Sequence, residues 1–522
     1  MIGRPLLSRA SARAADRALI GAGVLGIVLM ENAGRAATDV IVREMATHLA
    51  RPLIVGGLGQ NGGDAWVVAR QLRSRGVTSD VVLVGDPAKV AGDAAIALAS
   101  LRAIGLTPFT IERVEQLDAL RDRASLLIDG LFGTGLDRPL EGLVRDVIEQ
   151  LDTWTVPRVA LDLPSGVCAD TGRVLGAALR ADLTITLHAH KRGLHHAPGV
   201  SVAGRVVVAD IGAPAPVESE ATLVGAAELA AHTHARAIDA HKGTGGHVLV
   251  IAGSPGKTGA ALLSGLGAMR AGAGLVTLAT RGAARAALDA KVIELMTREV
   301  PEALEAGVGT VLADAARCAS AVLGPGLGLD DATRAFVRRL ILELPIPTVL
   351  DADALRAIAD HGSLDTLVRC AAPRVLTPHP AEAAALLGTT TEIIQSDRFA
   401  AASRLASVSR QCVVLKGART IVARADGTFV VCDRGTPALG VAGTGDVLSG
   451  VIAGLLAETR AATPSTTFDH AWRGVVAHAI AGERGANGRD RGLLASEVAE
   501  AVSLVMGDAV RDGARRAMSR RA

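Results

Sequence analysis

The chain has 522 residues, 49% of them hydrophobic, which is too long for a single core and supplies enough apolar surface for two or three domains. Its 55 basic and 53 acidic residues leave a net charge of +2, and six Phe, three Trp and no Tyr offer few platforms on which bases could stack. Nucleic acid is therefore not an expected partner.

Two further features of the composition concern the compartment. The five cysteines are scattered and show no C-x-x-C spacing, which fits a reducing cytoplasm and argues against structural zinc. The apolar run from Leu19 to Met30 is too short to span a membrane and has no signal-peptide cleavage pattern. We therefore expect a cytoplasmic protein without a membrane partner.

Strand and helix patterns alternate along the first half of the chain, which predicts a doubly wound parallel sheet in a three-layer α/β/α domain. Two helices come first, and the second is expected to end at Gly34 because glycine commonly closes a helix. The expected helices are 13–22, 24–33, 65–75 and 93–104, and the expected strands are 52–56, 80–84, 125–129 and 156–161.

Polar residues follow three of these strands. They are Asp64 in GLGQNGGD, Asp129 at the start of DGLFGTGLDRP, and Asp162 and Ser165 in LDLPSG. Because the carboxyl ends of parallel strands meet at one edge of a sheet, we expect these side chains to share a site with converging backbone amides. A single aspartate in such a loop is more often a turn former, whereas several after successive strands favour a site.

These motifs and the later segment ADLTITLHAHKRGL resemble the epimerase domain of the NAD(P)H-hydrate repair enzymes, over about residues 8 to 213. The resemblance implies a Rossmann-like fold with Asp162 as a catalytic residue. The implied substrate contacts are Gln60, Asn61, Gly62, Gly63, Asp64, Gly133, Thr134, Gly135, Leu136, Asp137, Arg138, Pro139 and Asp162.

The same resemblance implies a potassium ion (K+) held by Asn61, Asp129 and Ser165. Amide, carboxylate and hydroxyl oxygens are ligands that suit a hard cation. The sequence departs from the family at two positions of the first motif, since the family usually has Asn where Gln60 stands and Gly where Ala65 stands.

A Pro- and Glu-rich segment, residues 210–220, marks the exit from the first domain. A second βα series follows and predicts another three-layer α/β/α domain. No segment repeats the sequence of the first half, so internal duplication is not supported. The expected strands are 248–251, 275–279, 321–323, 348–350, 375–377 and 412–415, and the expected helices are 260–271 and 495–506.

The stretch VAGTGDVLSGVIAGLL, residues 441–456, combines a glycine-rich turn with an apolar helix. Gly443 and Gly445 free the backbone to bend, so that amide N–H groups at the helix start can converge on an anion such as a phosphate. Asp446 stands at the positive end of the helix dipole, which is expected to keep its carboxylate ionised and ready to accept a proton. The alternative is a capped helix after a tight turn, because short glycine motifs recur by chance.

Other loops of this half carry polar or glycine-rich sequences. GPGLG can bring backbone close to a ligand, and Asp351 and Asp353 alternate beyond a strand. His379 stands between two prolines, where a histidine is more often a plain turn residue. Lys416 and Arg419 end another strand with two cations, as phosphates favour, although exposed basic turns are common.

Together HKGTGG, GSPGKTGAA, GPGLG, LDADAL, TPHPAE, LKGART and AGTGD resemble the nucleotide-dependent NAD(P)H-hydrate dehydratases of the ribokinase-like superfamily, over about residues 222 to 508. GTGD also occurs in sugar and vitamin kinases, whereas TPHPAE and LKGART indicate the dehydratases. The family often has an acidic-aromatic pair where residues 244–245 are Thr-Gly.

This resemblance implies that Asp446 is a catalytic base and that Mg2+ accompanies ADP, or ATP in some relatives. The implied contacts with the hydrated nicotinamide nucleotide are Ala260, Gly326, His379 and Asp446, and the implied contacts with the adenine nucleotide are Lys416, Gly417, Ala418, Arg419, Thr420 and Gly445.

We therefore expect an epimerase-like domain at 1–215, a dehydratase-like domain at 222–510 and a basic tail at 511–522 that is disordered in solvent. The resemblance implies a bifunctional enzyme that interconverts the R and S hydrates of NADH or NADPH and dehydrates the S form, releasing AMP and phosphate. Its expected partners are these small molecules and further copies of the chain.

Two alternatives remain open. One is a ribokinase-like vitamin or sugar kinase, whose product keeps the phosphate. The other is a first half that binds nucleotides without catalysis, because a nucleotide-shaped pocket need not be an active site.

Overall fold

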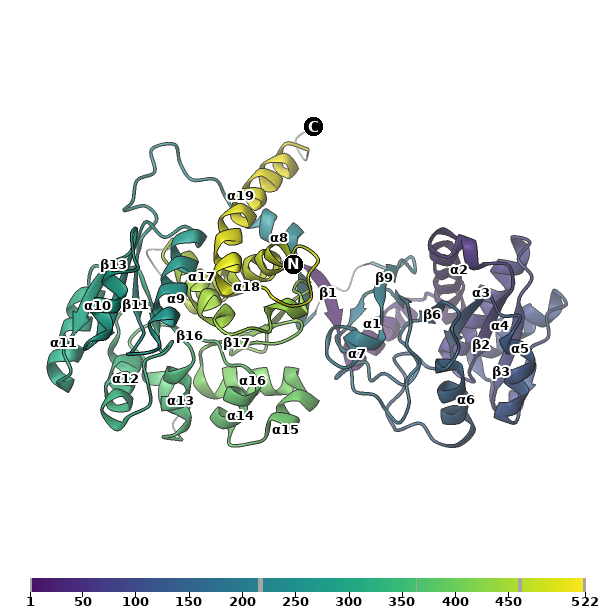
Figure 1. Cartoon of the computed structure of the whole chain (residues 1–522). Coiled ribbons are helices and arrows are strands. Elements are labelled where there is room, and N and C mark those ends of the chain that lie inside the picture. Colours follow the sequence, from purple (N-terminus) through teal and green to yellow (C-terminus); the bar gives the residue numbers. More distant parts are fainter. Residues whose placement is uncertain (1, 215–218, 363, 459–461, 520–522) are drawn as a thin grey trace. The chain divides into compact units, whose positions relative to one another are not determined.

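The computed structural model describes residues 2–214, 219–362, 364–458 and 462–519, so the centre of the expected linker, residues 215–218, lies outside the described residues. The chain divides into two compact units, one of Arg4–Glu220 and one of Ala221–Ala522 with the first three residues. The predicted α/β class with parallel sheets is confirmed in both units (Figure 1). Among the described helices, none combines the length and the apolar composition that crossing a bilayer requires.

The N-terminal unit is built on a parallel sheet with the strand order β4-β3-β2-β5-β6-β7-β9. The chain runs outward from β2 to β4 and then places β5 on the other side of β2. At such a switch point the loops after the two strands diverge and leave a crevice at their carboxyl ends. The strands are β2 (Pro52–Gly56), β3 (Asp80–Val84), β4 (Phe109–Ile111), β5 (Leu126–Gly130), β6 (Arg158–Leu161), β7 (Leu183–Leu187) and β9 (Arg205–Ala209).

Alternate residues of β2 face two separate apolar cores. Ile54 packs with helices α2, α3 and α4, whereas Leu53 and Val55 pack with α6. A strand places successive side chains on opposite faces, so both faces of the sheet are buried and its strands are continuously apolar. The helices are α1 (Arg9–Gly21), α2 (Gly26–Glu44), α3 (Gln60–Ser74), α4 (Gly92–Ala103) and α6 (Gly142–Asp152).

Three helix boundaries of this unit were predicted wrongly. α1 starts at Arg9 rather than at residue 13. α2 does not end at Gly34, because this glycine serves close packing: a Cβ there would lie 2.4 Å from Cγ1 of Val67 on α3. α3 starts at Gln60 rather than at residue 65, so the motif QNGGD forms its first turn. Since N–H groups of a first helical turn have no intrahelical acceptor, this motif brings backbone donors to the end of β2.

The C-terminal unit contains a sheet with the order β13-β12-β11-β14-β15-β16-β17-β18-β19-β10. Its pairs are parallel except for β17 with β18 and β18 with β19. The order reverses between β11 and β14, which is a second switch point. The strands are β10 (Ala221–Val224), β11 (His247–Ile251), β12 (Leu275–Arg281), β13 (Met296–Val300), β14 (Ser320–Leu323), β15 (Thr348–Leu350), β16 (Arg374–Leu376), β17 (Cys412–Leu415), β18 (Ile421–Ala423) and β19 (Phe429–Cys432).

Helices cover this second sheet as well (Figure 1). Val248 and Val250 of β11 pack in one core with helices α9, α17, α18 and α19, and α12 and α13 lie on the other side of the sheet. The helices used below are α9 (Thr258–Ala271), α12 (Asp331–Glu343), α13 (Asp353–Ala359), α14 (Pro380–Leu387), α16 (Arg398–Ser409), α17 (Thr444–Leu456), α18 (Pro464–Ala486) and α19 (Ala495–Ser519).

The prediction of a disordered tail from residue 511 is wrong for residues 511–519, which continue α19. Gly513 packs so closely that a Cβ there would lie 2.4 Å from the carbonyl oxygen of Ala230, and Arg516 donates a hydrogen bond to Ala227 O at 3.2 Å. Arg511 pairs with Asp508 one turn earlier. Tertiary packing and a local ion pair therefore extend the helix, whereas residues 520–522 lie outside the described residues.

Candidate active sites

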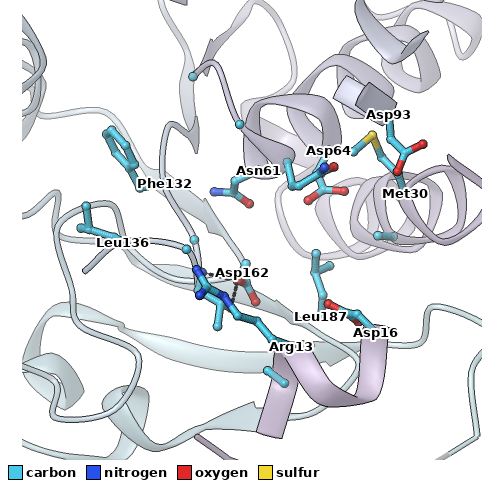
Figure 2. A pocket seen from close by; sticks show the side chains of 18 of the residues that line it. Arg13, Asp16, Met30, Asn61, Asp64, Asp93, Phe132, Leu136, Asp162 and Leu187 are labelled. Carbon is cyan, nitrogen blue, oxygen red and sulfur yellow. Dashed lines mark hydrogen bonds between the residues drawn. The ribbon is translucent and has the colours of Figure 1, made fainter. Parts of the chain in front are cut away.

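A pocket of about 670 Å³ lies in the N-terminal unit, where the loops after β2 and β5 diverge (Figure 2). Of the predicted substrate contacts, those that line it are Gln60, Asn61, Asp64, Gly133, Thr134, Gly135, Leu136, Arg138 and Asp162. Four others, Gly62, Gly63, Asp137 and Pro139, do not line this pocket although all four are among the described residues.

The two glycines of this second group serve packing in the structure. A Cβ at Gly62 would lie 2.0 Å from the carbonyl oxygen of Gly57, and one at Gly63 would lie 2.5 Å from Cε of Met30 on α2. They let the first turn of α3 approach the end of β2 and the neighbouring helix. Because Gly62 and Gly63 carry no side chain, this close approach is possible and Asn61 and Asp64 lie at the pocket wall.

Asp162 is buried and pairs with the ammonium of Lys191 at 2.7 Å. Its other oxygen accepts hydrogen bonds from the N–H of Thr134, at 2.8 Å, and from the Thr134 hydroxyl. Burial alone would raise the pKa of Asp162, but Lys191 and Thr134 outweigh it and hold the pKa below its usual value. Asp162 is therefore an ionised carboxylate, and its left-handed backbone (φ 63°) is one that non-glycine residues adopt rarely.

Asp64 lies in the same pocket, but its surroundings raise its pKa instead of lowering it. Its side chain is 8% exposed, and burial together with the charges of Asp162 and Asp16 raises its pKa well above the usual value. Figure 2 shows Asn61, Asp64 and Asp162 around one space. The pocket therefore holds one carboxylate that stays ionised and one carboxyl group that retains its proton more readily.

Beside this pocket, the predicted potassium ligands Asp129 and Ser165 contact each other. The Ser165 hydroxyl donates to Asp129 at 2.6 Å and its N–H donates at 2.8 Å. Burial raises the pKa of Asp129 to about 6 despite these bonds. Asn61 donates its amide N–H to Leu161 O at 3.1 Å, and its buried Oδ1 has no hydrogen-bond partner among the described residues.

Several pocket residues were missed by the sequence reasoning. Lys191 of β8 (His190–Lys191), His188, and Arg13 and Asp16 of α1 all line the pocket. Lys191 and His188 belong to the segment ADLTITLHAHKRGL, so that motif could have identified them. Arg13 and Asp16 lie on a helix far from the other motifs in sequence, and no local pattern distinguishes them.

The C-terminal unit has a second pocket of about 480 Å³ at its own switch point. Three predicted substrate contacts, Ala260, Gly326 and Asp446, line it together with Lys257 and Asp353, whereas His379 does not. Gly326 is left-handed (φ 64°), and a Cβ there would lie 2.9 Å from Lys257 O and 3.1 Å from the Ala260 side chain. Glycine is thus required where the loop after β14 meets the start of α9.

The first turn of α17 forms one wall of this pocket. Gly443 adopts a left-handed conformation (φ 92°), which turns the chain into the helix. The Thr444 hydroxyl donates to Leu439 O and Val441 O, and the Thr444 carbonyl lies 2.9 Å from Nε2 of buried His478. Burial lowers the pKa of His478 to about 4, so the ring is neutral and Nε2–H donates to the carbonyl. The helix start is therefore fixed, with its N–H groups left for an anion.

The state of Asp446 differs from the sequence prediction. The helix dipole was expected to keep it ionised, but burial and the neighbouring Asp351 charge raise its pKa to about 6, against a weaker opposing effect of Lys416. Near neutral pH the carboxylate is still the major form, with a basicity that suits proton transfer.

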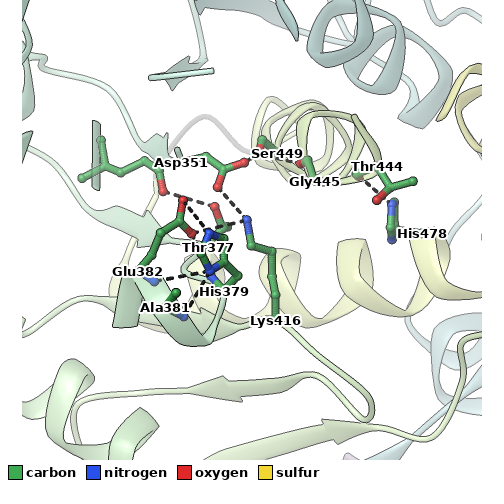
Figure 3. A network of polar contacts seen from close by, with 11 residues as sticks. Asp351, Thr377, His379, Ala381, Glu382, Lys416, Thr444, Gly445, Ser449 and His478 are labelled. Carbon is green, nitrogen blue, oxygen red and sulfur yellow. Dashed lines mark hydrogen bonds and ion pairs between the residues drawn. The ribbon is translucent and has the colours of Figure 1, made fainter. Parts of the chain in front are cut away.

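A polar network joins α17 to the ends of three strands (Figure 3). Lys416, at the end of β17, pairs with Asp351 at 2.8 Å and with Glu382 at 3.9 Å. Glu382 accepts a hydrogen bond from the His379 N–H at 2.8 Å, and burial raises the pKa of Glu382 to about 7. Burial and Lys416 lower the pKa of His379. His379 is therefore neutral near pH 7 and caps α14 through Nδ1, which accepts from Ala381 N–H at 3.1 Å.

The predicted nucleotide contacts from Lys416 to Thr420 form a turn after β17, held by the buried Arg398 of α16. The Arg398 guanidinium donates to the carbonyl oxygens of Leu415, Lys416 and Ala418. Burial lowers its pKa to about 10, so it remains charged. Gly417 (φ 144°) lies against this guanidinium, where a Cβ would be 2.8 Å from Nη2. Gly445, the last predicted contact, lies in the first turn of α17.

Comparisons with known proteins cover both units. A family model described as NAD(P)H-hydrate dehydratase matches residues 248–503, and one described as YjeF-related protein N-terminus matches residues 26–193. Among solved structures, the ADP/ATP-dependent NAD(P)H-hydrate dehydratase of Bacillus subtilis, co-crystallised with ATP/Mg2+, is 28% identical with a TM-score of 0.46 and covers 54% of this chain and 97% of that chain.

The chain also matches full-length curated relatives named bifunctional NAD(P)H-hydrate repair enzyme Nnr. The protein from Moorella thermoacetica is 38% identical over 92% of both chains, and that from Thermanaerovibrio acidaminovorans is 36% identical over 95% of this chain and 97% of its own. The protein from Salinibacter ruber is 39% identical over 87% of this chain and 88% of its own. The chain belongs to the family of bifunctional NAD(P)H-hydrate repair enzymes.

Proposed function

We infer that the two pockets carry the two activities of this family. The N-terminal pocket interconverts the R and S hydrates of NADH or NADPH, and the C-terminal pocket dehydrates the S hydrate with the help of ADP or ATP. The observation that carries this inference is that each unit has its own pocket at its own switch point, lined by motifs of the corresponding family. We propose residues 1–215 as the epimerase domain and 222–510 as the dehydratase domain.

In the C-terminal pocket the hydrate is first phosphorylated. Its hydroxyl oxygen forms a bond to the terminal phosphorus of ADP, the bond from that phosphorus to the bridging oxygen breaks, and the electron pair leaves with AMP. Asp446 takes the hydroxyl proton, and the N–H groups of the first turn of α17 stabilise the transferred phosphoryl group. The phosphorylated carbon then loses phosphate and the adjacent carbon loses a proton, which restores the double bond of the nicotinamide ring.

Mg2+ is proposed to enter with the nucleotide, where it neutralises phosphate charge. No group of three or more His, Cys, Asp or Glu side chains in the described residues forms a metal cage. That finding is compatible with Mg2+, which keeps several waters and binds through one or two carboxylates and the phosphates. Asp353, which lines the pocket, is a suitable donor.

In the N-terminal pocket, the potassium ligands are proposed to be Asn61, Asp129 and Ser165. The unpartnered Oδ1 of Asn61 and the buried Asp129 carboxylate, which has no lysine or arginine partner among the described residues, both fit a monovalent cation. The ionised Asp162, oriented by Lys191 and Thr134, is proposed to bind the hydrate next to this cation as the catalytic carboxylate.

We further propose a cytoplasmic enzyme that assembles with copies of itself. Its function is tested by incubating the purified chain with mixed hydrate epimers, ADP and Mg2+, while absorbance and phosphate are followed together. Regained reduced-nicotinamide absorbance with one equivalent of free phosphate supports repair of both epimers. A stable phosphorylated product would contradict it, and consumption of only half of the hydrate would contradict the epimerase assignment.

A further inference from the structure

Lys416 belongs in sequence to the turn after β17, but its ammonium points away from that turn. Gly417 and Ala418 are exposed, whereas the Lys416 side chain turns toward the first turn of α17 (Figure 3). A methyl group added at Gly445 would lie 3.5 Å from its Nζ and 3.9 Å from Oδ2 of Asp351. The positive charge therefore lies beside the N–H groups that are proposed to receive the transferred phosphoryl group.

Asp351 fixes this position by joining two elements. It is 2% exposed, and one of its oxygens accepts a hydrogen bond from Lys416 at 2.8 Å. The other accepts from the hydroxyl of Ser449, a fully buried residue of α17 whose oxygen also lies 2.9 Å from the carbonyl of Gly445. The carboxylate thus ties the end of β17 to the first turn of α17.

The ammonium also keeps donors for a ligand. It has three N–H groups. Within the described part of the chain Asp351 is its hydrogen-bond acceptor, while Glu382 lies 3.9 Å away, beyond hydrogen-bond reach. The Lys416 side chain is 20% exposed, and even this partial burial of a charge has a desolvation cost that a surface contact with a nucleotide would not require.

We propose that Lys416 is a catalytic group that contacts the phosphoryl group in transfer, and that Asp351 and Ser449 are its positioning residues. This proposal rests on the phosphorylation step above. Lys416 keeps its proton throughout: the oxygen–phosphorus bond forms, the bond to the bridging oxygen breaks toward AMP, and the hydroxyl proton goes to Asp446. The ammonium stabilises the charge on the phosphoryl oxygens, which preorganised donors do best where water is excluded.

The test uses the full chain with the S hydrate, ADP and Mg2+, and measures kcat together with the Kd of ADP. Lys416→Met is expected to lower kcat by about 100-fold or more, as loss of such a donor does, with a change of less than about threefold in the Kd. Asp351→Asn is expected to show the same pattern more weakly. Combined with Lys416→Met it should have no further effect at pH 8, where Asp446 is ionised with or without the Asp351 charge, because Asp351 then acts through the lysine.

Two further variants separate this role from folding. Gly445→Ala has room for its methyl, whose nearest contacts are at 3.5 Å, yet covers the approach to the ammonium, so kcat should fall while the melting temperature stays within a few degrees of wild type. Lys291→Met, an exposed lysine that lines neither pocket, controls for the loss of one positive charge and should match wild type.

Unchanged kcat with a raised Kd of ADP in Lys416→Met would overturn the proposal and leave Lys416 as a nucleotide contact. A further loss in the double variant would show that Asp351 acts independently. Failure of the wild-type chain to release phosphate from hydrate and ADP would instead contradict the proposed function itself, so the two failures are distinguishable.

Discussion

The replacement Asp446→Asn removes the proposed base while keeping its size. Loss of a general base lowers turnover by about 100- to 10,000-fold, and the pKa of about 6 adds a pH signature. A carboxyl group with this pKa is ionised to about 90% at pH 7 and to about 10% at pH 5. The wild-type kcat/KM for dehydration should therefore fall about tenfold from pH 7 to pH 5. An aspartate at its usual pKa would stay ionised over this range, so its kcat/KM would change little.

The same pKa shift predicts that the stability of the folded state falls with rising pH, whereas the rate of dehydration rises. Asp446 binds its proton more tightly in the folded state than in the unfolded state, so the folded state becomes less stable as pH rises from about 4 to 6. The shift from 3.8 to about 6 corresponds to about 3 kcal/mol. At pH 8 the Asn variant should gain up to about 3 kcal/mol in free energy of unfolding, and at pH 4 it should gain little.

The assay is the initial rate of dehydration of the S hydrate from pH 5 to 8, with urea unfolding at pH 8 and pH 4. Glu382 has a pKa raised to about 7 and titrates in the same range, so Glu382→Gln serves as the control that isolates the Asp446 step. A rate that is constant from pH 5 to 7 in that background would refute the assignment. So would an Asn variant that turns over within threefold of wild type.

Three further outcomes are expected. Asn61→Ala should slow epimerisation and weaken its response to added K+, without changing dehydration; equal loss of both activities would contradict separate sites. Lys191→Met should abolish epimerisation and lower the free energy of unfolding by about 3–5 kcal/mol, because it leaves Asp162 buried without its cation; a wild-type urea midpoint would contradict this. Arg398→Met should raise the KM for ADP and lower the melting temperature, since three carbonyl groups of the turn at 415–418 lose their donor; an unchanged KM would mean that the turn does not bind ADP.

The fold class and the edge of each sheet that carries a pocket were accessible from sequence for a physical reason, whereas the order of the strands was not predicted. Strands buried on both faces are short apolar runs, and parallel connections place every loop that follows a strand at the same edge. Asp129 and Ser165 were therefore expected near each other, and the structure brings them within hydrogen-bond distance. Most of the predicted contacts in the first motif and in DGLFGTGLDRP line one pocket on the same principle.

What sequence could not supply depends on contacts between distant segments. Gly34 lies inside a helix, where it allows close packing, whereas Gly443 stands at the start of a helix. The sequence does not distinguish these two uses of glycine, because they depend on which helix packs nearby. The dipole argument for Asp446 omitted its burial and the charge of Asp351, which follows β15. The tail became helical through its packing on residues near 230, which composition does not reveal.

Although the halves share no sequence repeat, both sites distribute charge in the same way. In each, a buried carboxylate that follows a strand pairs with a lysine on or just after a later strand, Asp162 with Lys191 at 2.7 Å and Asp351 with Lys416 at 2.8 Å. In each, a second carboxyl group nearby has a raised pKa, Asp64 in one pocket and Asp446 in the other. In the C-terminal site Asp351 is held by its lysine, while Asp446, whose pKa burial raises to about 6, can exchange a proton near neutral pH. In the N-terminal site Asp162 is held by its lysine, and burial likewise raises the pKa of Asp64. In the C-terminal site, neutralising Asp351 should therefore disturb the geometry, whereas neutralising Asp446 should remove the proton transfer.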